Sequence, residues 1–476
     1  MKMSLSPKDI LINKAIALFN DGQLKKSINV TLRAKKKFPD EPFIYNLLGV
    51  LYADIKCYED SIKNYLKAIK LNPKYFEAYN NIGVAYASCK KIDKSLVYFD
   101  RAIQINPLYA EAYNNKGNSL KENSDYALAL EAYEKAVQLN PNYTEAITNL
   151  GIIWDVMNDF TKAEGFFQKA LTLKPNDTLV LYNLANCLFN AKKFKKVIEV
   201  CQNIIDIDVS FYYAYNRIGL CYLYLENEEQ AKSFFERAIQ INPNYSEGLT
   251  NYGFVLQKLR NYSLATVQFE KALNIDPNGF EALVNLSKSY FEEGKLTKAI
   301  EVVEKGLSLQ PLNIPLLKNL VASLTLLDRI DEASVACKKI LAINNDDADA
   351  VNAMGSIYEK KGLYDDAKTH FLRAIGLNKN LVSAKLNLAT TYQLEGNIEK
   401  ANKVYKELVK ENPENPEVLY RKSAFALQLE NFEEGWRYYE NRWKVFPMNR
   451  VKRPYLRKEV WKGEREKTVA LWREQG

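Results

Sequence analysis

The chain has 476 residues, of which 47% are hydrophobic, and a formal net charge of +8. Residues 441–476 hold eleven Lys and Arg against four Asp and Glu, a net charge of +7, so the preceding 440 residues are almost neutral. This balance argues against a nucleic-acid groove along the chain, and no apolar stretch approaches the length of a membrane span.

The cysteines follow no regular spacing and include no Cys-x-x-Cys pair. They are Cys57, Cys89, Cys187, Cys201, Cys221 and Cys337. The spacing indicates neither a disulfide framework nor a zinc site, so we interpret the cysteines as small buried side chains in a reducing compartment. Residues 1–11 lack the apolar region of a signal peptide. These features predict a cytoplasmic protein that does not enter a membrane.

Proline recurs at a fixed step of 34 residues. It stands at Pro39, Pro73, Pro107, Pro141, Pro175, Pro243, Pro277, Pro311, Pro413 and Pro447, and Val209, Asn345 and Lys379 occupy the remaining steps of the series. A period without insertions indicates one small unit copied thirteen times and stacked in a line. We therefore expect an N-terminal leader over residues 1–7, a repeat array over 8–449 and a different segment over 450–476.

One unit, residues 76–109, shows the pattern of two helices. Apolar and small residues recur at helical spacing in both halves: Tyr79, Ile82, Gly83 and Tyr86 in the first, then Leu96, Phe99 and Ile103 in the second. Pro107 ends the second helix, because the residue before a proline avoids the α conformation. Twelve residues before each periodic position stands a small residue, with Val197 the exception, which indicates closely packed helices.

Seven first helices carry a glycine near their middle: Gly49, Gly83, Gly117, Gly151, Gly219, Gly253 and Gly355. Glycine lowers helix stability by about 1 kcal/mol at such a position. We therefore expect a close contact there between the first and second helices of one unit.

Small, aromatic and proline residues at these positions resemble the tetratricopeptide repeat. The resemblance covers nearly the whole chain. It implies an all-α fold, a right-handed superhelical solenoid of about thirteen 34-residue helix-turn-helix repeats. It also implies that the first helices line a concave groove, which receives partner proteins as extended segments.

Asparagine recurs two residues before the glycine position. Besides Asn13, the row comprises Asn81, Asn115, Asn149, Asn183, Asn251, Asn285, Asn319 and Asn387. An amide both donates and accepts, so one amide per repeat could hold an extended polypeptide without reading its side chains. These eight asparagines are our candidate peptide-binding groove. The alternative is that each one hydrogen-bonds within its own helical hairpin.

The asparagine row is interrupted by Leu47, Arg217, Ala353 and Arg421. Near one interruption, Tyr213, Arg217 and Tyr224 bring together residue types that are enriched in binding hot spots. These residues are a second candidate site. The alternative is that the tyrosines pack between helices.

The sequence changes character after Asn431. Four of the five tryptophans follow it, namely Trp436, Trp443, Trp461 and Trp472, together with the excess positive charge. Residues 468–472 form a short apolar run rich in strand-forming residues, followed by a glycine at Gly476. This pattern predicts a basic linker and the first strand of a truncated α/β domain over residues 450–476.

Three motifs carry a second resemblance: GWRYYENRW from Gly435, WKG from Trp461, and the strand that ends in EQG at Gly476. They resemble the junction in bacterial proteins of the O-GlcNAc transferase type, which join a tetratricopeptide array to a glycosyltransferase domain. The chain departs from that pattern at Arg473. The resemblance implies a nucleotide sugar as cofactor of a following domain. The alternative is a basic amphipathic tail for an acidic partner or a membrane surface.

No catalytic or metal-binding constellation is found in the sequence, and the single histidine, His370, lies among polar residues of a second helix. We therefore expect a protein-interaction scaffold that binds extended polypeptide, as the substrate-recruiting part of a larger glycosyltransferase. Its partners would be proteins or peptides, and it would need no cofactor of its own. The alternative is a freestanding scaffold for a multiprotein complex. The sequence leaves a homo-oligomer open.

Overall fold

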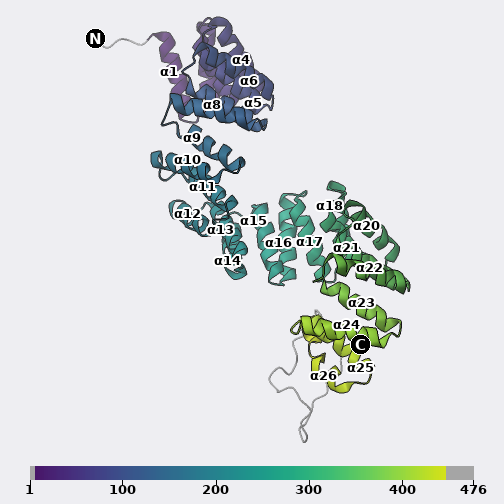
Figure 1. Cartoon of the computed structure of the whole chain (residues 1–476). Helices are drawn as coiled ribbons and strands as arrows, with labels where there is room; N and C mark the ends of the chain where they lie inside the picture. Colours follow the sequence, from purple (N-terminus) through teal and green to yellow (C-terminus); the bar gives the residue numbers. More distant parts are fainter. Residues whose placement is uncertain (1–5, 446–476) are drawn as a thin grey trace. The chain divides into compact units, whose positions relative to one another are not determined.

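The computed structural model describes residues 6–445. Within this range the chain forms helices α1 to α27 and no strand (Figure 1). The residues divide into two compact units, one up to Val255 and one from Leu256, with the boundary inside α15. The predicted all-α solenoid of about thirteen helix-turn-helix repeats is confirmed. The predicted linker and strand over 450–476 lie outside the described residues.

Each repeat contributes a first and a second helix. The first helices are α1 (Pro7–Asn20), α3 (Pro42–Asp54), α5 (Phe76–Ser88), α7 (Ala110–Glu122), α9 (Thr144–Val156), α11 (Thr178–Asn190), α13 (Tyr212–Tyr224), α15 (Ser246–Lys258), α17 (Phe280–Glu292), α19 (Ile314–Leu326), α21 (Ala348–Lys360), α23 (Val382–Leu394) and α25 (Pro416–Gln428).

The second helices are α2 (Leu24–Lys37), α4 (Tyr58–Leu71), α6 (Ile92–Ile105), α8 (Tyr126–Leu139), α10 (Phe160–Leu173), α12 (Phe194–Ile207), α14 (Glu228–Ile241), α16 (Tyr262–Ile275), α18 (Leu296–Leu309), α20 (Ile330–Ile343), α22 (Tyr364–Leu377), α24 (Ile398–Glu411) and α26 (Phe432–Tyr439). The short helix α27 (Arg442–Val445) follows α26 and packs on α25.

Every hairpin turn contains one residue in the left-handed backbone conformation, at the same place in all thirteen repeats. Four of these residues are glycines, and the other nine are Lys56, Lys90, Ser124, Asn158, Lys192, Glu226, Arg260, Asp328 and Glu430. The left-handed conformation costs a non-glycine residue about 1–2 kcal/mol. The packing of the two helices therefore holds these turns against a local preference for other conformations.

The mid-helix glycines lie against an aromatic ring of the second helix in the same repeat. A Cβ atom added to Gly151 would lie 2.6 Å from Cε1 of Phe167, and the other glycines with this geometry are Gly49, Gly83, Gly117, Gly219 and Gly355. The predicted close contact is confirmed at these positions. The small residues of the second helices are buried as well, and the hydroxyl of Ser61 donates to the Gly49 carbonyl at 2.7 Å.

In the repeats formed by α11 with α12 and by α19 with α20, the residue at the glycine position is larger than glycine, and the residue at the facing aromatic position is smaller than an aromatic ring. Val321 replaces the glycine in α19, and the facing position in α20 is Cys337 instead of an aromatic residue; both side chains are buried in one cluster. Ala185 and Cys201 make the same exchange between α11 and α12. Because a core keeps its total volume more strictly than its individual residues, the larger first partner is matched by a smaller second one in these two repeats. Ala389 of α23, in contrast, keeps an aromatic partner, Tyr405.

First helices of successive repeats also contact one another within each unit. The contacting pairs are α3 and α5, α5 and α7, α7 and α9, α9 and α11, α17 and α19, α19 and α21, α21 and α23, and α23 and α25. Equivalent residues of these helices therefore form a row that runs from repeat to repeat. This row contains the candidate site.

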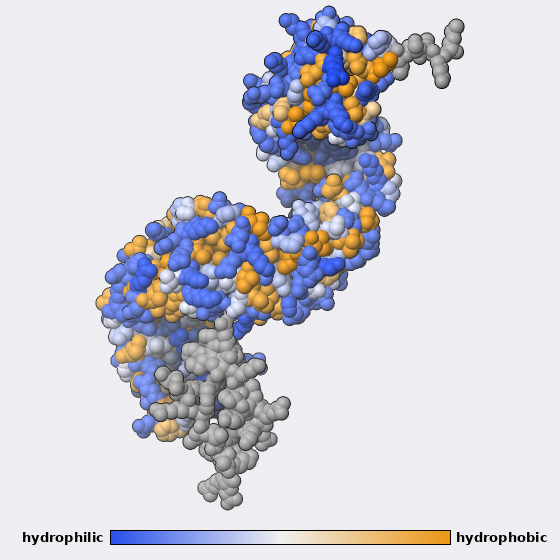
Figure 2. All heavy atoms as spheres, turned by 180° about the vertical axis from the view of Figure 1, so that it is seen from behind, coloured by the Kyte–Doolittle hydropathy of each residue, from blue (hydrophilic) through white to orange (hydrophobic). Residues whose placement is uncertain are grey.

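The surface of the described residues mixes polar and apolar side chains, and Figure 2 shows the two kinds interspersed over the face that it displays. None of the helices described is long and apolar enough to cross a membrane. Exposure of apolar residues alone does not single out a binding site here, because scattered apolar residues are normal on protein surfaces.

The cysteines are not all buried, which corrects our interpretation of them. Cys57 is exposed at the start of α4 and Cys89 is half-buried, whereas the other four are buried. Burial raises the pKa of Cys201 and of Cys221 to about 12.

We expect iodoacetamide at pH 8 to alkylate Cys57 in the folded protein and the buried thiols only after unfolding, because the thiolate is the reactive species. Peptide mass spectrometry checks this order, and early labelling of Cys201 would contradict it.

Candidate binding surface

The candidate asparagines occupy equivalent positions in the first helices, and we call this row the asparagine face. In five of the eight, the side-chain Nδ2 donates to the Oδ1 of another asparagine 35 residues earlier, in the preceding repeat. The pairs are Asn81 with Asn46 (3.1 Å), Asn115 with Asn80 (3.0 Å), Asn149 with Asn114 (3.0 Å), Asn251 with Asn216 (2.9 Å) and Asn387 with Asn352 (3.1 Å).

The partner asparagines form a second, deeper layer in unit 1. Asn114 is fully buried, accepts from Asn149 and donates to Glu145 of the next repeat at 2.9 Å. Asn80 and Asn216 are buried in the same way, and they donate to Glu111 and Glu247. A buried amide that both donates and accepts is well satisfied. These chains of bonds therefore tie successive first helices together.

The bonds also orient the amides of the asparagine face. Because Nδ2 of Asn115 points to Asn80, its Oδ1 points away from that partner. No described residue donates a hydrogen bond to Oδ1 of Asn81, Asn115, Asn149, Asn251 or Asn387. Each oxygen thus keeps its lone pairs for solvent or for a bound chain.

Three asparagines of the face depart from this pattern. Asn285 donates to the carbonyl of Glu281 in its own helix, and Asn319 donates to the hydroxyl of Ser287 at 2.8 Å. No hydrogen bond joins the Asn183 side chain to another described residue. In all three cases the residue 35 positions earlier is threonine or valine, which cannot present an amide oxygen.

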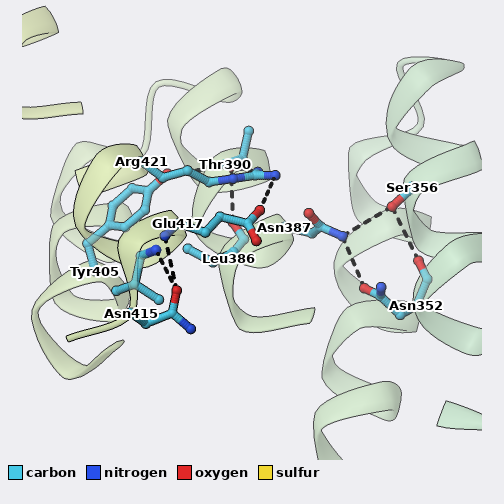
Figure 3. A network of polar contacts seen from close by, with 10 residues as sticks. Asn352, Ser356, Leu386, Asn387, Thr390, Tyr405, Asn415, Glu417 and Arg421 are labelled. Carbon is cyan, nitrogen blue, oxygen red and sulfur yellow. Dashed lines mark hydrogen bonds and ion pairs between the residues drawn. The ribbon is translucent and has the colours of Figure 1, made fainter. Parts of the chain in front are cut away.

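Figure 3 shows Asn387 of the asparagine face, in α23, with its neighbours in α21 and α25. Asn387 donates to Asn352 and, at 3.2 Å, to the hydroxyl of Ser356. One repeat later the row is interrupted by Arg421, whose guanidinium lies beside Thr390 and forms an ion pair with Glu417 at 3.1 Å. This interruption thus carries a cation whose charge is already neutralised.

The residues that brace the face were not predicted from the sequence. The alternative interpretation, a bond within the same hairpin, is not what the five paired asparagines make, since their partner lies in the preceding repeat. The available signal was asparagine one residue before the face position, at Asn46, Asn80, Asn114, Asn216 and Asn352. Each of these asparagines stands 35 residues before the face asparagine that it bonds, one more than the repeat length of 34. This spacing becomes meaningful only when the first helices of neighbouring repeats are known to lie side by side.

The structure brings Arg217 into a cluster of aromatic rings from α11 and α13. Its guanidinium carbon lies 4.8 Å from the Phe189 ring centre and 5.7 Å from that of Tyr182, and Nη2 donates to the Tyr182 hydroxyl at 3.4 Å. Burial raises the pKa of Tyr182, while the Arg217 charge acts in the opposite direction. These distances fit cation–π contacts.

The two candidate tyrosines belong to the same cluster. The Tyr224 ring stacks on Phe194, with ring centres 5.0 Å apart, and 63% of Tyr224 is exposed. Tyr213 lies 5.9 Å from Tyr182 and is 38% exposed. Both rings therefore pack against other aromatic residues and are partly exposed to solvent.

Family models of the tetratricopeptide repeat match this chain along much of its length. Those described as "Tetratricopeptide repeat" match residues 76–109, 110–143, 212–245, 256–324, 348–381 and 383–415, and one described as "TPR repeat" matches 57–88. Together they cover more than half of the 476 residues. The chain belongs to the tetratricopeptide repeat proteins.

Solved structures of other tetratricopeptide repeat proteins are similar to parts of this chain. YrrB, described as having an unusual peptide-binding site, is 25% identical, with a TM-score of 0.34, over 39% of this chain and 95% of its own. The Cut9–Hcn1 structure is 15% identical, with a TM-score of 0.48, over 93% of this chain and 94% of its own. A protein from Parabacteroides merdae is 18% identical, with a TM-score of 0.42, over 52% of this chain and 98% of its own. Comparison with curated proteins gives no match.

Among residues 6–445 this tetratricopeptide repeat protein has no cluster of His, Cys, Asp and Glu suited to a metal ion. A shallow pocket of about 270 Å³ lies between α13 and α14, lined by Tyr215, Phe234, Glu236 and Arg237 among others. Tyr215 donates to the Val209 carbonyl and is 7% exposed, so it packs between helices. Two features therefore remain that a partner could use. They are the asparagine face and the group of aromatic rings around Arg217.

Proposed function

We propose that this tetratricopeptide repeat protein is an interaction scaffold that binds extended polypeptide along its asparagine face. The observation that carries the proposal is the set of amide oxygens of Asn81, Asn115 and Asn149 in three successive repeats, which bonds to the preceding repeat orient. An amide oxygen accepts from a peptide N–H whatever side chain that residue carries. Binding would therefore depend little on the partner's sequence.

The spacing of the repeats fits this role. Packed helices lie about 8–10 Å apart, and an extended chain advances about 3.3–3.6 Å per residue. One amide per repeat can therefore hold about every third residue of the bound segment. Because the bonds to the preceding repeat fix the amides before binding, less side-chain entropy is lost when the partner arrives.

The asparagine face can be tested by replacing Asn115, Asn149 and Asn183 together with alanine. Each hydrogen bond contributes about 0.5–1.5 kcal/mol, so we expect the affinity for an extended polypeptide to fall at least about tenfold. A suitable probe is reduced, carboxymethylated and fluorescently labelled lactalbumin, which stays unfolded, with binding followed by fluorescence anisotropy. Asn183 is the most direct single test, since its side chain bonds to no other described residue.

A matched control replaces three exposed asparagines outside the face with alanine, namely Asn142, Asn176 and Asn203. We expect this variant to bind the probe like the wild type. Thermal melts followed by circular dichroism show whether the face variant is still folded at the assay temperature. Equal affinity of the face variant and the control would exclude the amide mechanism.

A finer hypothesis is that the bound polypeptide is the substrate of a glycosyltransferase domain that follows Gly476. It is supported by the motifs at residues 435–443 and 461–476, most of which lie outside the described residues. The test is the reading frame beyond Gly476 in the source DNA. Continuation through Gly-Asp into an α/β domain supports a transferase that uses a nucleotide sugar. A stop codon supports the freestanding scaffold.

Three further properties stay predictions from the sequence. They are the cytoplasmic location, the lack of nucleic-acid binding by the nearly neutral array, and an oligomeric state that includes a homo-oligomer. Cell fractionation, a gel-shift assay and light scattering, respectively, measure them.

A further inference from the structure

Arg217 occupies a position where most repeats have an asparagine, and its charge has no counterion among residues 6–445. No described carboxylate forms an ion pair with it. The acidic residue of the next repeat, Glu247, instead accepts a bond from Asn216 at 3.2 Å. Arg421, at the equivalent position of unit 2, is paired with Glu417. Of these two arginines, only Arg217 is available to neutralise a charge on a partner.

Two polar atoms at this place lack any hydrogen-bond partner among the described residues. One is Nε of Arg217, a donor, and the other is Oδ1 of Asn186, an acceptor; both atoms are buried. Asn186 lies on α11 four residues after Tyr182 and three before Phe189, so it shares a helix face with the rings that hold the guanidinium. Buried polar atoms without partners are rare and destabilising.

A polypeptide with an acidic side chain would supply the counter-charge that Arg217 lacks. A carboxylate forms strong, charge-assisted bonds with a guanidinium, and the Arg217 side chain is only partly buried. The half-exposed rings of Tyr213 and Tyr224 offer flat faces to an apolar neighbour of the acidic residue. Aromatic and arginine side chains together are typical of binding hot spots.

We propose that the Arg217 cluster, formed by Tyr182, Asn186, Phe189, Tyr213, Arg217 and Tyr224, binds an Asp or Glu side chain next to an apolar residue of the extended partner. This proposal rests on the proposed function of the asparagine face and adds selectivity to it. The amides hold backbone without regard to sequence, and the Arg217 cluster sets which residue lies in the seventh repeat. The partner segment would thereby acquire a defined register.

The proposal predicts the outcome of peptide selection. The full chain, its Arg217→Gln variant and its Arg421→Gln variant would each be immobilised and used to select random dodecapeptides displayed on phage. We expect the wild type and Arg421→Gln to enrich peptides with Asp or Glu beside an apolar residue. Arg217→Gln should still retain displayed peptides above the bare support, but without that acidic preference. An acidic preference that survives in Arg217→Gln overturns the proposal.

A double-mutant cycle then tests the contact itself. The best selected peptide is made with blocked termini, so that its only relevant carboxylate is a side chain, and again with glutamine or asparagine in place of the acid. We expect this exchange to weaken binding to the wild type about tenfold or more. On Arg217→Gln it should change the affinity less than about twofold. Equal losses on both proteins contradict a direct contact.

The failure of this inference can be told from a failure of the proposed function. If the wild type enriches peptides without acidic preference, the Arg217 cluster is not an acidic subsite, while the asparagine face can still bind polypeptide. If the wild type retains no more displayed peptides than the bare support, both proposals are wrong. A thermal melt of Arg217→Gln that matches the wild type shows that lost selectivity is not lost folding.

Discussion

Replacing Phe167 with cysteine is expected to lower the free energy of unfolding of the α9–α10 hairpin by about 3 kcal/mol. Phe167 is 1% exposed, and its ring fills the space above Gly151 that other residues would fill with a Cβ atom. Truncation leaves a cavity, because the backbones of two packed helices cannot close it fully. Urea denaturation, together with hydrogen exchange of the α9 and α10 amides, measures the loss in the repeat concerned.

The chain itself suggests how that loss can be recovered. Val321 and Cys337 occupy the two equivalent positions in a later repeat, and both are buried. We expect Gly151→Val alone to destabilise by about 1–3 kcal/mol through overpacking. The double variant Gly151→Val with Phe167→Cys should lose clearly less than the sum of the single changes. If the losses of unfolding free energy from the two single changes simply add in the double variant, the two side chains do not compete for the same space.

A control for backbone effects is available in the same hairpin. Gly165 is exposed in α10, and an added Cβ atom there would meet nothing within 4 Å. We expect Gly165→Ala to stabilise the hairpin by about 0.5–1 kcal/mol, since alanine favours the helix.

Replacing Glu434 with alanine is expected to destabilise the last described repeat by about 3–5 kcal/mol. Its partner Lys422 has a side chain that is only 3% exposed, and the two are joined at 3.3 Å between α25 and α26. Without Glu434 the ammonium group would keep, within the described part of the chain, only the bond to Asn402, at 2.9 Å, and its contact with the Phe425 ring. A buried charge without a counterion is costly. Hydrogen exchange in α25 and α26 measures the effect.

Two controls separate burial from charge. Glu417→Ala breaks the neighbouring ion pair of Arg421, whose partners are 36% and 48% exposed, and should change stability by at most about 1 kcal/mol. Replacing Lys422 with methionine and Glu434 with leucine together should recover most of the loss, because an apolar pair needs no desolvation of charge. If Glu434→Ala behaves like Glu417→Ala, Lys422 is not effectively buried.

The candidate site was only partly predictable. The periodicity located the asparagine face, because each residue of the row recurs in one register of the repeat. The bonds of Asn149 to Asn114, and of Asn114 to Glu145, join different repeats. A sequence read one repeat at a time cannot show them, since their spacings of 35 and 31 have meaning only when neighbouring first helices lie side by side. Whether the face binds polypeptide stays a prediction.

The sequence by itself determined the repeat length, the two helices of each unit and the small residues at their contact, because helical periodicity and proline positions are local properties. Only the tertiary structure decided that Arg217 lies near two aromatic rings with no counterion from the described residues, while Arg421 is neutralised. The same holds for the nine non-glycine residues in left-handed turns. In each case the deciding energy comes from packing against another helix, which no single stretch of sequence contains.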